Sequence, residues 1–437
     1  MQRPRGTGGE AADNRRIRHP SIIARRGHAT ATATIATLAA KPPLEVDVSL
    51  PRLSARSHRI QPFHVMALLG RARALEAGGR DIIHMEIGEP DFPTATPVRE
   101  AGARALADGH TGYLPAAGLP ALREAIAGHY AERYGVAVDA GRILVTPGAS
   151  GALVVAMAML ADPGRNVLLP DPGYPCNRNF VELVDAVPRA VRVDAGTDYQ
   201  LTPALAEAAC DESTAAMLVG SPGNPTGTLA SADDLAGLGR LAQQRGIGLV
   251  VDEIYHGLDY DGMPAQALVH APDAIVVNSF SKYFGMTGWR LGWMVVPPDW
   301  VPVAEKIMQN LFISASTPAQ YAALACFTDR SLAIFESRRE AFRQRRDCLL
   351  PVLRELGFDI PGHPAGAFYL YADVAALCDD SFAFAQDLLE RAGVAVTPGL
   401  DFERTAPERH LRFAYTTDTD RLLEAGERIR RYLAAGG

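Results

Sequence analysis

Lys282 is the residue of this sequence best suited to covalent chemistry. It follows an apolar segment, lies among small and hydroxyl-bearing residues in Ser279–Tyr283, and is followed by Arg290. Burial and nearby cations lower the pKa of a lysine and leave a neutral, nucleophilic amine. Such an amine forms a Schiff base with an aldehyde cofactor, and serine hydroxyls and an arginine donate hydrogen bonds to a phosphate. Taken alone, the segment is equally well interpreted as a surface loop that happens to carry a lysine.

A carboxylate, Asp252, ends a second apolar segment, and Tyr255 follows it. A carboxylate at such a place is costly unless a cation faces it, and a protonated pyridine nitrogen is one such cation. Three more segments could line a site. Thr146–Gly151 presents backbone N–H groups where a strand meets a helix, Asp171–Pro175 offers an aromatic face, and Ser221–Gly227 is rich in turn residues.

Apolar segments alternate with helical ones from about residue 50 onward, and these elements must position the residues above. The predicted strands are Arg142–Val145, Asn166–Leu169, Ala215–Val219, Gly248–Asp252, Ala274–Asn278 and Leu291–Val296. Their apolar, non-alternating character predicts an α/β fold in which helices cover both faces of a mostly parallel sheet. In such a sheet the site lies beyond the carboxyl ends of the strands, which is where the polar residues occur.

The C-terminal third has a different pattern, which predicts a smaller α+β domain. Its expected elements are a long charged helix at about Ser331–Leu356, a strand near Ala367–Tyr371, a helix near Phe382–Ala392, strands near Val394–Val396 and His410–Ala414, and a final helix from Asp418. A helix at about His64–Ala77 is expected to pack with this domain. The predicted division is a basic tail (1–46), an N-terminal arm with part of the small domain (47–88), a large domain (89–325) and a small domain (326–437).

Composition excludes several classes of protein. The 437 residues are 48% hydrophobic and 21% charged, and the net charge of −7 argues against a dedicated nucleic-acid binder. No apolar run reaches about 18 residues, so no membrane-spanning helix is predicted. The five cysteines have no metal-binding spacing, which predicts free thiols in a cytoplasmic protein and no metal site.

Residues 1–40 differ from the rest, with seven arginines against two acids. Arg25 and Arg26 resemble a twin-arginine signal, and a targeting peptide is another interpretation, but the run Ala29–Ala40 is a poor apolar segment. We favour a disordered tail, or a start codon assigned too far upstream.

Considered together, the order and spacing of these motifs resemble the class I/II pyridoxal-phosphate aminotransferases of fold type I, the aspartate aminotransferase superfamily. The resemblance extends from about Leu50 to the C-terminus. The motifs that carry it are Gly88–Phe92, Thr111–Tyr113, Gly148–Gly151, Asp171–Pro175, Ser221–Gly227, Asp252–Tyr255, Ser279–Arg290, Pro364–Tyr369 and Arg412. It implies pyridoxal 5′-phosphate as the cofactor and a homodimer with shared active sites. The implied reaction is a ping-pong transfer of an amino group from an L-amino acid to a 2-oxo acid.

The resemblance also implies residue roles. Lys282 corresponds to the Schiff-base lysine, which moves a proton to or from the substrate Cα. Asp252 corresponds to the aspartate that keeps the pyridine nitrogen protonated, so that the ring withdraws electrons. Tyr255 and Asn224 correspond to donors to the ring oxygen. The remaining cofactor contacts implied are stacking by Tyr174 and phosphate binding by the amides of Ala149 and Ser150, by Ser279, Ser281 and Arg290, and by Tyr113 of the neighbouring subunit.

Arg412 corresponds to the arginine that binds the substrate α-carboxylate through two parallel hydrogen bonds, with Asn224 in the same substrate-binding set. Gly88 lies where a side chain would crowd that carboxylate. Some aspartate-specific relatives bind the substrate side chain with an arginine of the other subunit, and the comparable segment here, Asn310–Ser314, carries no cation. Another aspartate-active branch has a lysine at the position of Ser150. These departures weaken a dicarboxylate-specific interpretation. They predict a neutral or aromatic donor, with 2-oxoglutarate or pyruvate as acceptor.

Two other classes of function compete. A β-lyase, a decarboxylase or a cyclopropane-carboxylate-synthase-like enzyme would use the same Lys282 and Asp252 but break another bond at Cα. Arg412 and the pair Tyr255 and Asn224 favour transamination. A transcription regulator with an aminotransferase-like sensor domain would need a DNA-binding domain, and residues 1–46 are too short and irregular for a winged helix.

Overall fold

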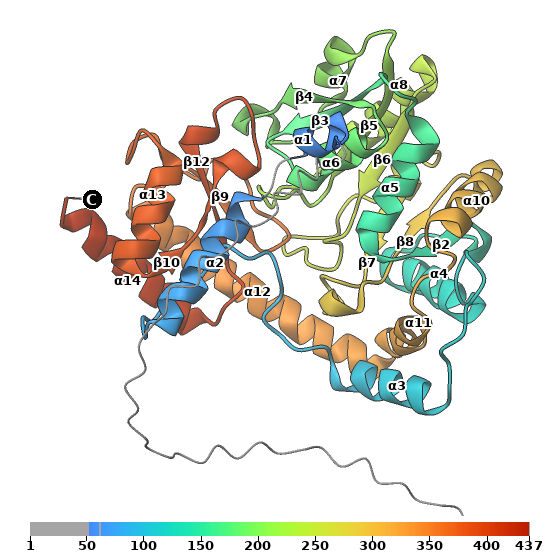
Figure 1. The fold of residues 1–437 in the computed structure, drawn as a ribbon, viewed down its shortest axis with the longest axis horizontal. Coiled ribbons are helices and arrows are strands. Elements are labelled where there is room, and N and C mark those ends of the chain that lie inside the picture. Colours follow the sequence, from blue (N-terminus) through green and yellow to red (C-terminus); the bar gives the residue numbers. More distant parts are fainter. Residues whose placement is uncertain (1–51, 61–62, 437) are drawn as a thin grey trace, which may run out of the picture. The chain divides into compact units, whose positions relative to one another are not determined.

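The central sheet of the computed structural model has seven strands in the order β2-β8-β7-β6-β5-β3-β4 (Figure 1). The structure describes residues 52–60 and 63–436. The strands of this sheet are β2 (Ile143–Thr146), β3 (Asn166–Asp171), β4 (Val187–Arg192), β5 (Thr214–Gly220), β6 (Gly248–Asp252), β7 (Ile275–Ser279) and β8 (Gly292–Val295). Strands β3 to β7 pair in parallel, so the predicted mostly parallel sheet is confirmed.

Strand β8 is antiparallel to both of its neighbours, β2 and β7. The connection from β7 to β8 contains a single 3₁₀ turn, Thr287–Trp289, instead of a helical crossover. A chain without a crossover returns alongside the strand it has just left, which gives antiparallel pairing. This returning connection carries both Lys282 and Arg290.

Strand β4 was absent from the predicted set. It forms the edge of the sheet, contains Pro188, and is exposed or half-buried along most of its length. An edge strand tolerates proline and does not need an apolar run, so its sequence lacks the signal that identified the buried strands.

Helices cover both faces of the central sheet, as expected. Helix α5 packs on β7 and β8, and α8 packs on β6. Along β6, Leu249 and Val251 belong to one buried cluster and Val250 to the other, so each face has its own core. The helices are α1 (Ala55–Arg59), α2 (His64–Ala77), α3 (Thr96–Ala107), α4 (Pro120–Tyr134), α5 (Gly148–Leu160), α6 (Pro175–Leu183), α7 (Pro203–Ala209), α8 (Ala232–Arg245), α9 (Ala267–His270), α10 (Val301–Leu311), α11 (Thr317–Leu324), α12 (Asp329–Glu355), α13 (Ser381–Asp387) and α14 (Thr419–Ala434).

Two small sheets lie outside the central one. One contains β9 (Tyr369–Asp373), β11 (Thr397–Pro398) and β12 (His410–Ala414), all antiparallel, and the other pairs β1 (Ile83–His84) in parallel with β10 (Val394–Ala395). Helix α12 packs against α14 at one part of its length and α3 at another (Figure 1).

The domain boundaries predicted at residues 88 and 325 stay a prediction, and the tail predicted for 1–46 lies outside the described residues. None of the described helices has the length and apolar character needed to cross a membrane.

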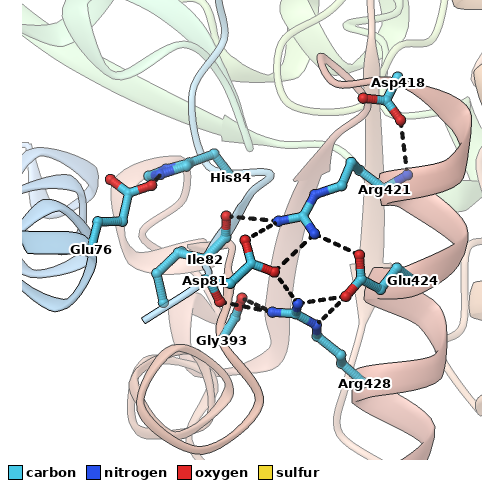
Figure 2. A network of polar contacts seen from close by, with 9 residues as sticks. All are labelled: Glu76, Asp81, Ile82, His84, Gly393, Asp418, Arg421, Glu424 and Arg428. Atoms are coloured by element: carbon cyan, nitrogen blue, oxygen red, sulfur yellow. Dashed lines mark hydrogen bonds and ion pairs between the residues drawn. The ribbon is translucent and has the colours of Figure 1, made fainter. Parts of the chain in front are cut away.

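The segment around β1 is tied to helix α14 by a network centred on Asp81 (Figure 2). Arg421 donates to both carboxylate oxygens of Asp81, at 2.7 and 2.9 Å, and Arg428 donates to the Asp81 carbonyl at 2.8 Å. The hydrogen bond from Arg421 is the main reason that the pKa of Asp81 falls to about 2. The chain that leaves β1 towards Gly88 therefore starts from a fixed point on the C-terminal helix.

Helix α2 receives its N-terminal cap from a residue distant in the sequence. The side chain before the helix, Phe63, makes no capping hydrogen bond. Instead, the buried carboxylate of Asp401 accepts hydrogen bonds from the backbone N–H groups of His64 and Val65, both at 2.8 Å. This contact joins the start of α2 to the loop between β11 and β12.

We expect Asp401→Ala to lower the free energy of unfolding by about 1–2 kcal/mol, because two N–H groups of α2 lose their acceptor. Urea unfolding measures the loss, and hydrogen exchange should locate it in the first turn of α2. Asp401→Asn retains one acceptor oxygen and should lose less. Equal stability of the wild type and both variants would contradict this cap.

Candidate active site

Lys282, the predicted nucleophile, is largely buried where the β7–β8 connection meets the chain that leaves β1. Its Nζ donates a hydrogen bond to the carbonyl oxygen of Gly88 at 2.7 Å. The rings of Tyr255 and Phe368 each lie with their centre 5.6 Å from Nζ. Burial, reinforced by the nearby Arg412, lowers the pKa of Lys282 to about 8. An appreciable part of this amine is therefore neutral near physiological pH.

Asp252 ends β6 as a carboxylate that is only 6% exposed. Burial raises its pKa to about 7, and one hydrogen bond, from the Ile254 N–H at 3.2 Å, opposes that rise. Within residues 52–60 and 63–436, no Lys, Arg or His side chain lies within ion-pair distance of this carboxylate. The arrangement suits a carboxylate that is completed by a cation from a bound molecule.

Arg412, on β12, is a buried cation whose hydrogen-bond acceptors are uncharged. Its guanidinium donates to Asn224 Oδ1 at 2.9 Å and to the Glu86 carbonyl at 2.6 Å, and lies 3.3 Å from Thr397 Oγ1. No carboxylate of the described chain forms an ion pair with Arg412, and its buried Nε has no partner there. A desolvated guanidinium of this kind is prepared to bind a carboxylate from outside.

The predicted phosphate-binding residues surround the start of α5. Ala149 and Ser150 lie in its first turn, which is not capped by a side chain. A Cβ on Gly148 would lie 2.7 Å from Arg290 Nη2, so the arginine is close to the backbone there. Ser279 Oγ and Ser281 Oγ are 3.0 Å apart, and both side chains are buried. Backbone N–H groups, hydroxyls and a guanidinium near one another form an anion site.

Tyr174 and Tyr113, the two aromatic residues predicted to contact the cofactor from outside the strands, have different surroundings. Tyr174 precedes α6 and lines one pocket together with Asn224, Asp252 and Tyr255. Tyr113 does not join them in the chain described, because it lies on a loop and is 79% exposed. The described residues contain no group of three or more His, Cys, Asp or Glu side chains that could hold a metal ion.

Sequence reasoning missed some members of this site. Tyr369, at the start of β9, forms a hydrogen bond with Tyr255 and lies over Arg412. It is the last residue of the motif Pro364–Tyr369, and this motif is the signal in the sequence that could have identified it. The carbonyls of Glu86 and Gly88 also hold site residues, but a backbone acceptor leaves no trace in side-chain identity.

Gly88 was expected to leave room for the substrate carboxylate, and the structure gives a different immediate reason for a glycine. A Cβ on Gly88 would lie 2.2 Å from the Tyr369 hydroxyl oxygen. No side chain can be placed there without moving Tyr369. The glycine therefore lets the backbone approach Tyr369 closely and still present its carbonyl to Lys282.

The charges and donors of this site fit pyridoxal phosphate. Asp252 is a buried carboxylate that lacks a cation, which suits a pyridinium nitrogen. The start of α5 with Arg290 suits a phosphate, and the partly neutral Lys282 suits an aldehyde. A Cβ on Gly292 would lie 2.7 Å from the Gly148 carbonyl carbon, so the backbone in this cradle is too close to admit a side chain.

Asp252→Asn tests whether the buried carboxylate lacks a cation in the cofactor-free protein. Because folding raises the pKa of Asp252 to about 7, its contribution to stability is present at low pH and is lost as pH rises to about 7. We expect the cofactor-free Asn variant to be more stable than the wild type by about 2–4 kcal/mol at about pH 8, with no difference near pH 4. With pyridoxal phosphate bound, the advantage should shrink or reverse. Parallel stability–pH profiles of the two cofactor-free proteins would contradict this.

Comparison with known proteins identifies the family. The model of the family "Aminotransferase class I and II" matches residues 80–429. A valine–pyruvate aminotransferase of Mycobacterium tuberculosis is 35% identical over 377 residues, which cover 86% of this chain and 97% of that protein. An aspartate/prephenate aminotransferase of Thermus thermophilus is 36% identical, with coverage of 87% and 98%. A solved aminotransferase of M. tuberculosis has a TM-score of 0.85 at 34% identity, covering 88% of this chain and 100% of that chain.

These matches confirm the fold and the reaction that the motifs implied. Members of this family use pyridoxal phosphate, and the matched relatives are named for amino-group transfer. The chain belongs to the class I and II aminotransferases, and it is a pyridoxal-phosphate-dependent enzyme that moves an amino group from an amino acid to a 2-oxo acid.

Proposed function

We propose that Lys282 and Arg412 act as a pair, the amine handling the Cα proton and the guanidinium binding the α-carboxylate. The observation that carries this proposal is their common support. Lys282 donates to the carbonyl of Gly88, and Arg412 donates to the carbonyl of Glu86, two residues earlier on the same stretch of chain. A substrate whose carboxylate meets Arg412 would thus present its Cα to an amine held at a fixed spacing.

When bound, pyridoxal phosphate supplies an aldehyde that captures amines and a ring that withdraws electrons from Cα. The chain's own residues would then divide the remaining work. Asp252 would face the pyridine nitrogen, and Tyr255 and Asn224 would donate to the ring oxygen. Lys282, with its pKa lowered to about 8, can accept and return a proton near neutral pH.

We propose the phosphate and stacking contacts on the same basis. Ala149, Ser150, Ser279, Ser281 and Arg290 would hold the phosphate, because they form the anion site at the start of α5. Tyr174 would stack on the ring, since it lines the pocket that contains Asp252.

A homodimer with shared sites is part of the proposal. The strongly exposed Tyr113 would contact the phosphate bound by the partner subunit, which accounts for its distance from its own site. A cytoplasmic location is supported by the cysteines, which are free thiols in the described residues.

For the amino donor, we propose a neutral or aromatic L-amino acid, with pyruvate or 2-oxoglutarate as acceptor. Ser150 offers no positive charge to a second substrate carboxylate. The relatives' names include both a valine–pyruvate and an aspartate/prephenate enzyme, so likeness alone does not choose between donor classes.

Two arginines could favour an acidic donor instead. Arg178 and Arg404 line a cavity of about 470 Å³ that also contacts Tyr174. Arg178, however, donates to the carbonyls of Asp401 and Phe402, at 2.8 and 3.3 Å, which occupies part of its hydrogen-bonding capacity. Because Arg404 is exposed to solvent and Arg178 is already hydrogen-bonded, we keep the neutral or aromatic donor as the proposal.

The test is an absorbance spectrum of the purified holoenzyme, before and after single L-amino acids are added. We expect alanine, valine, leucine or phenylalanine to convert the cofactor's visible band to its amino form, and pyruvate or 2-oxoglutarate to restore it. A rate with aspartate that exceeds those with the neutral and aromatic acids by about tenfold, about 1.4 kcal/mol of barrier, would overturn the donor proposal. If that occurs, Arg178→Met should reduce the aspartate rate.

The role of Lys282 can be tested in the same preparation, because the chain contains three lysines, Lys41, Lys282 and Lys306. Borohydride reduction of the holoenzyme should attach the cofactor to Lys282 alone, as read by peptide mass. Lys306, on the exposed side of α10, supplies the matched control: Lys306→Arg should label normally and Lys282→Arg should not.

We expect Arg412→Ala to reduce kcat/KM for every amino donor by about 100-fold to 1,000-fold, because the substrate carboxylate loses a buried, charged partner. Arg409→Ala, which removes an exposed arginine from the residues just before β12, is the control and should leave kcat/KM unchanged. Steady-state kinetics with two unrelated donors measures both variants. A loss confined to one donor would show that Arg412 contacts the side chain of the substrate instead of its α-carboxylate.

A further inference from the structure

Tyr369 occupies the centre of the candidate site without an assigned role. It begins β9 and is 1% exposed. Its hydroxyl lies 2.9 Å from the hydroxyl of Tyr255, and its ring lies over the guanidinium of Arg412, with 4.3 Å from the arginine Cζ to the ring centre. One side chain therefore contacts a group assigned to the cofactor and a group assigned to the substrate.

The hydrogen bond between the two tyrosines has a direction that matters for Tyr255. A phenol has one proton to donate and can also accept. If Tyr255 uses its proton on the ring oxygen of the cofactor, the bond between the tyrosines must be donated by Tyr369. A hydroxyl that accepts a hydrogen bond becomes a better donor, so Tyr369 strengthens the bond that Tyr255 donates.

The ring of Tyr369 has a separate effect on Arg412. The ring of Phe402 also lies by the guanidinium, with its centre 4.6 Å from Cζ, so two aromatic faces contact this cation. Aromatic faces attract a cation and restrict its orientation without neutralising it. The guanidinium is thereby held in place while its charge stays available to a carboxylate.

We propose that Tyr369 is a positioning residue of this aminotransferase, orienting the Tyr255 hydroxyl towards the cofactor through its own hydroxyl and holding Arg412 for the substrate carboxylate through its ring. The inference deepens the proposed function, because it rests on the roles proposed there for Tyr255 and Arg412. It also explains the glycine at position 88, whose Cβ would collide with the same hydroxyl.

Two substitutions of Tyr369 separate the effect of its hydroxyl on Tyr255 from the effect of its ring on Arg412. Tyr369→Phe removes the hydroxyl and keeps the ring, so Tyr255 should donate more weakly and stabilise the cofactor's ring oxygen less as an anion. The bound cofactor then keeps its proton to higher pH, and the pH midpoint of the holoenzyme's visible absorbance should rise by about 0.5 pH unit. KM for the amino donor should change by less than about twofold. Tyr369→Leu also removes the ring and should raise KM about fivefold to tenfold.

Tyr371→Phe is the matched control. Tyr371 lies two residues along β9, is equally buried, and loses a hydrogen bond of 3.0 Å to Glu403 when its hydroxyl is removed. Tyr371 pairs with Arg412 across β9 and β12 through the backbone register, but none of its side-chain hydrogen bonds or ring contacts in the described residues involves Tyr255 or Arg412. Its variant should leave the absorbance midpoint and KM unchanged, while losing comparable stability.

A double-variant cycle gives the decisive result. The shift caused by Tyr369→Phe should disappear when Tyr255 is already phenylalanine, because the hydroxyl acts through Tyr255. A shift of equal size in both backgrounds, or no shift in the wild-type background, would overturn the inference. If Tyr369→Phe does not fold, as judged by thermal melting of the cofactor-free protein, Gly88→Ala displaces the same hydroxyl and should raise the midpoint similarly.

Failure of the proposed function would look different. A wild-type holoenzyme whose cofactor band does not respond to any amino acid would refute the proposed donor chemistry. A wild type that responds normally, with Tyr369→Phe and Tyr369→Leu both matching it in midpoint and KM, would refute the role of Tyr369 alone.

Discussion

Desolvation of like charges is the constraint on which the rest of this structure depends. Lys282 and Arg412 lie close enough that the arginine helps to lower the pKa of the lysine, yet neither forms an ion pair with a carboxylate of the described residues. An Asp or Glu paired with Arg412 would neutralise the charge that is proposed to attract the substrate carboxylate. A carboxylate paired with Lys282 would keep the amine protonated and so prevent it from accepting a proton. Main-chain carbonyls hold both side chains without neutralising them, so backbone placement has to be accurate.

The fold supplies that accuracy from two directions. The central sheet delivers Asp252 and Lys282 at the ends of neighbouring strands, and the antiparallel return to β8 brings Arg290 back to the start of α5. The carbonyls come from the chain after β1, which is joined to β10 and clamped to α14 through Asp81. Asp81 is remote from the chemistry, but it fixes the origin of the segment that holds both cations.

Much of this arrangement could be predicted from the sequence, for identifiable reasons. Buried strands such as Gly248–Asp252 carry an apolar signal, and a lysine among serines after such a strand is distinctive. The edge strand β4 and the antiparallel direction of β8 were not predictable from composition, because neither depends on side-chain hydrophobicity. Tyr369 was missed as a site residue because the role proposed for it depends on a hydroxyl contact with Tyr255, 114 residues away.

Under the roles proposed for Lys282 and Arg412, their shared backbone support would also determine which substrates fit. Arg412 is held at the carbonyl of Glu86 and Lys282 at that of Gly88, so the distance from the proposed carboxylate-binding group to the amine is set by a short piece of backbone. Molecules with one carbon between the carboxylate and the amino group would match the distance between Arg412 and Lys282, whatever their side chain. Beta- and gamma-amino acids, in which this separation is longer, would bring a different carbon to the lysine. With the roles proposed for Lys282 and Arg412, the main chain would thus select α-amino acids over their positional isomers, and the pocket would select among side chains.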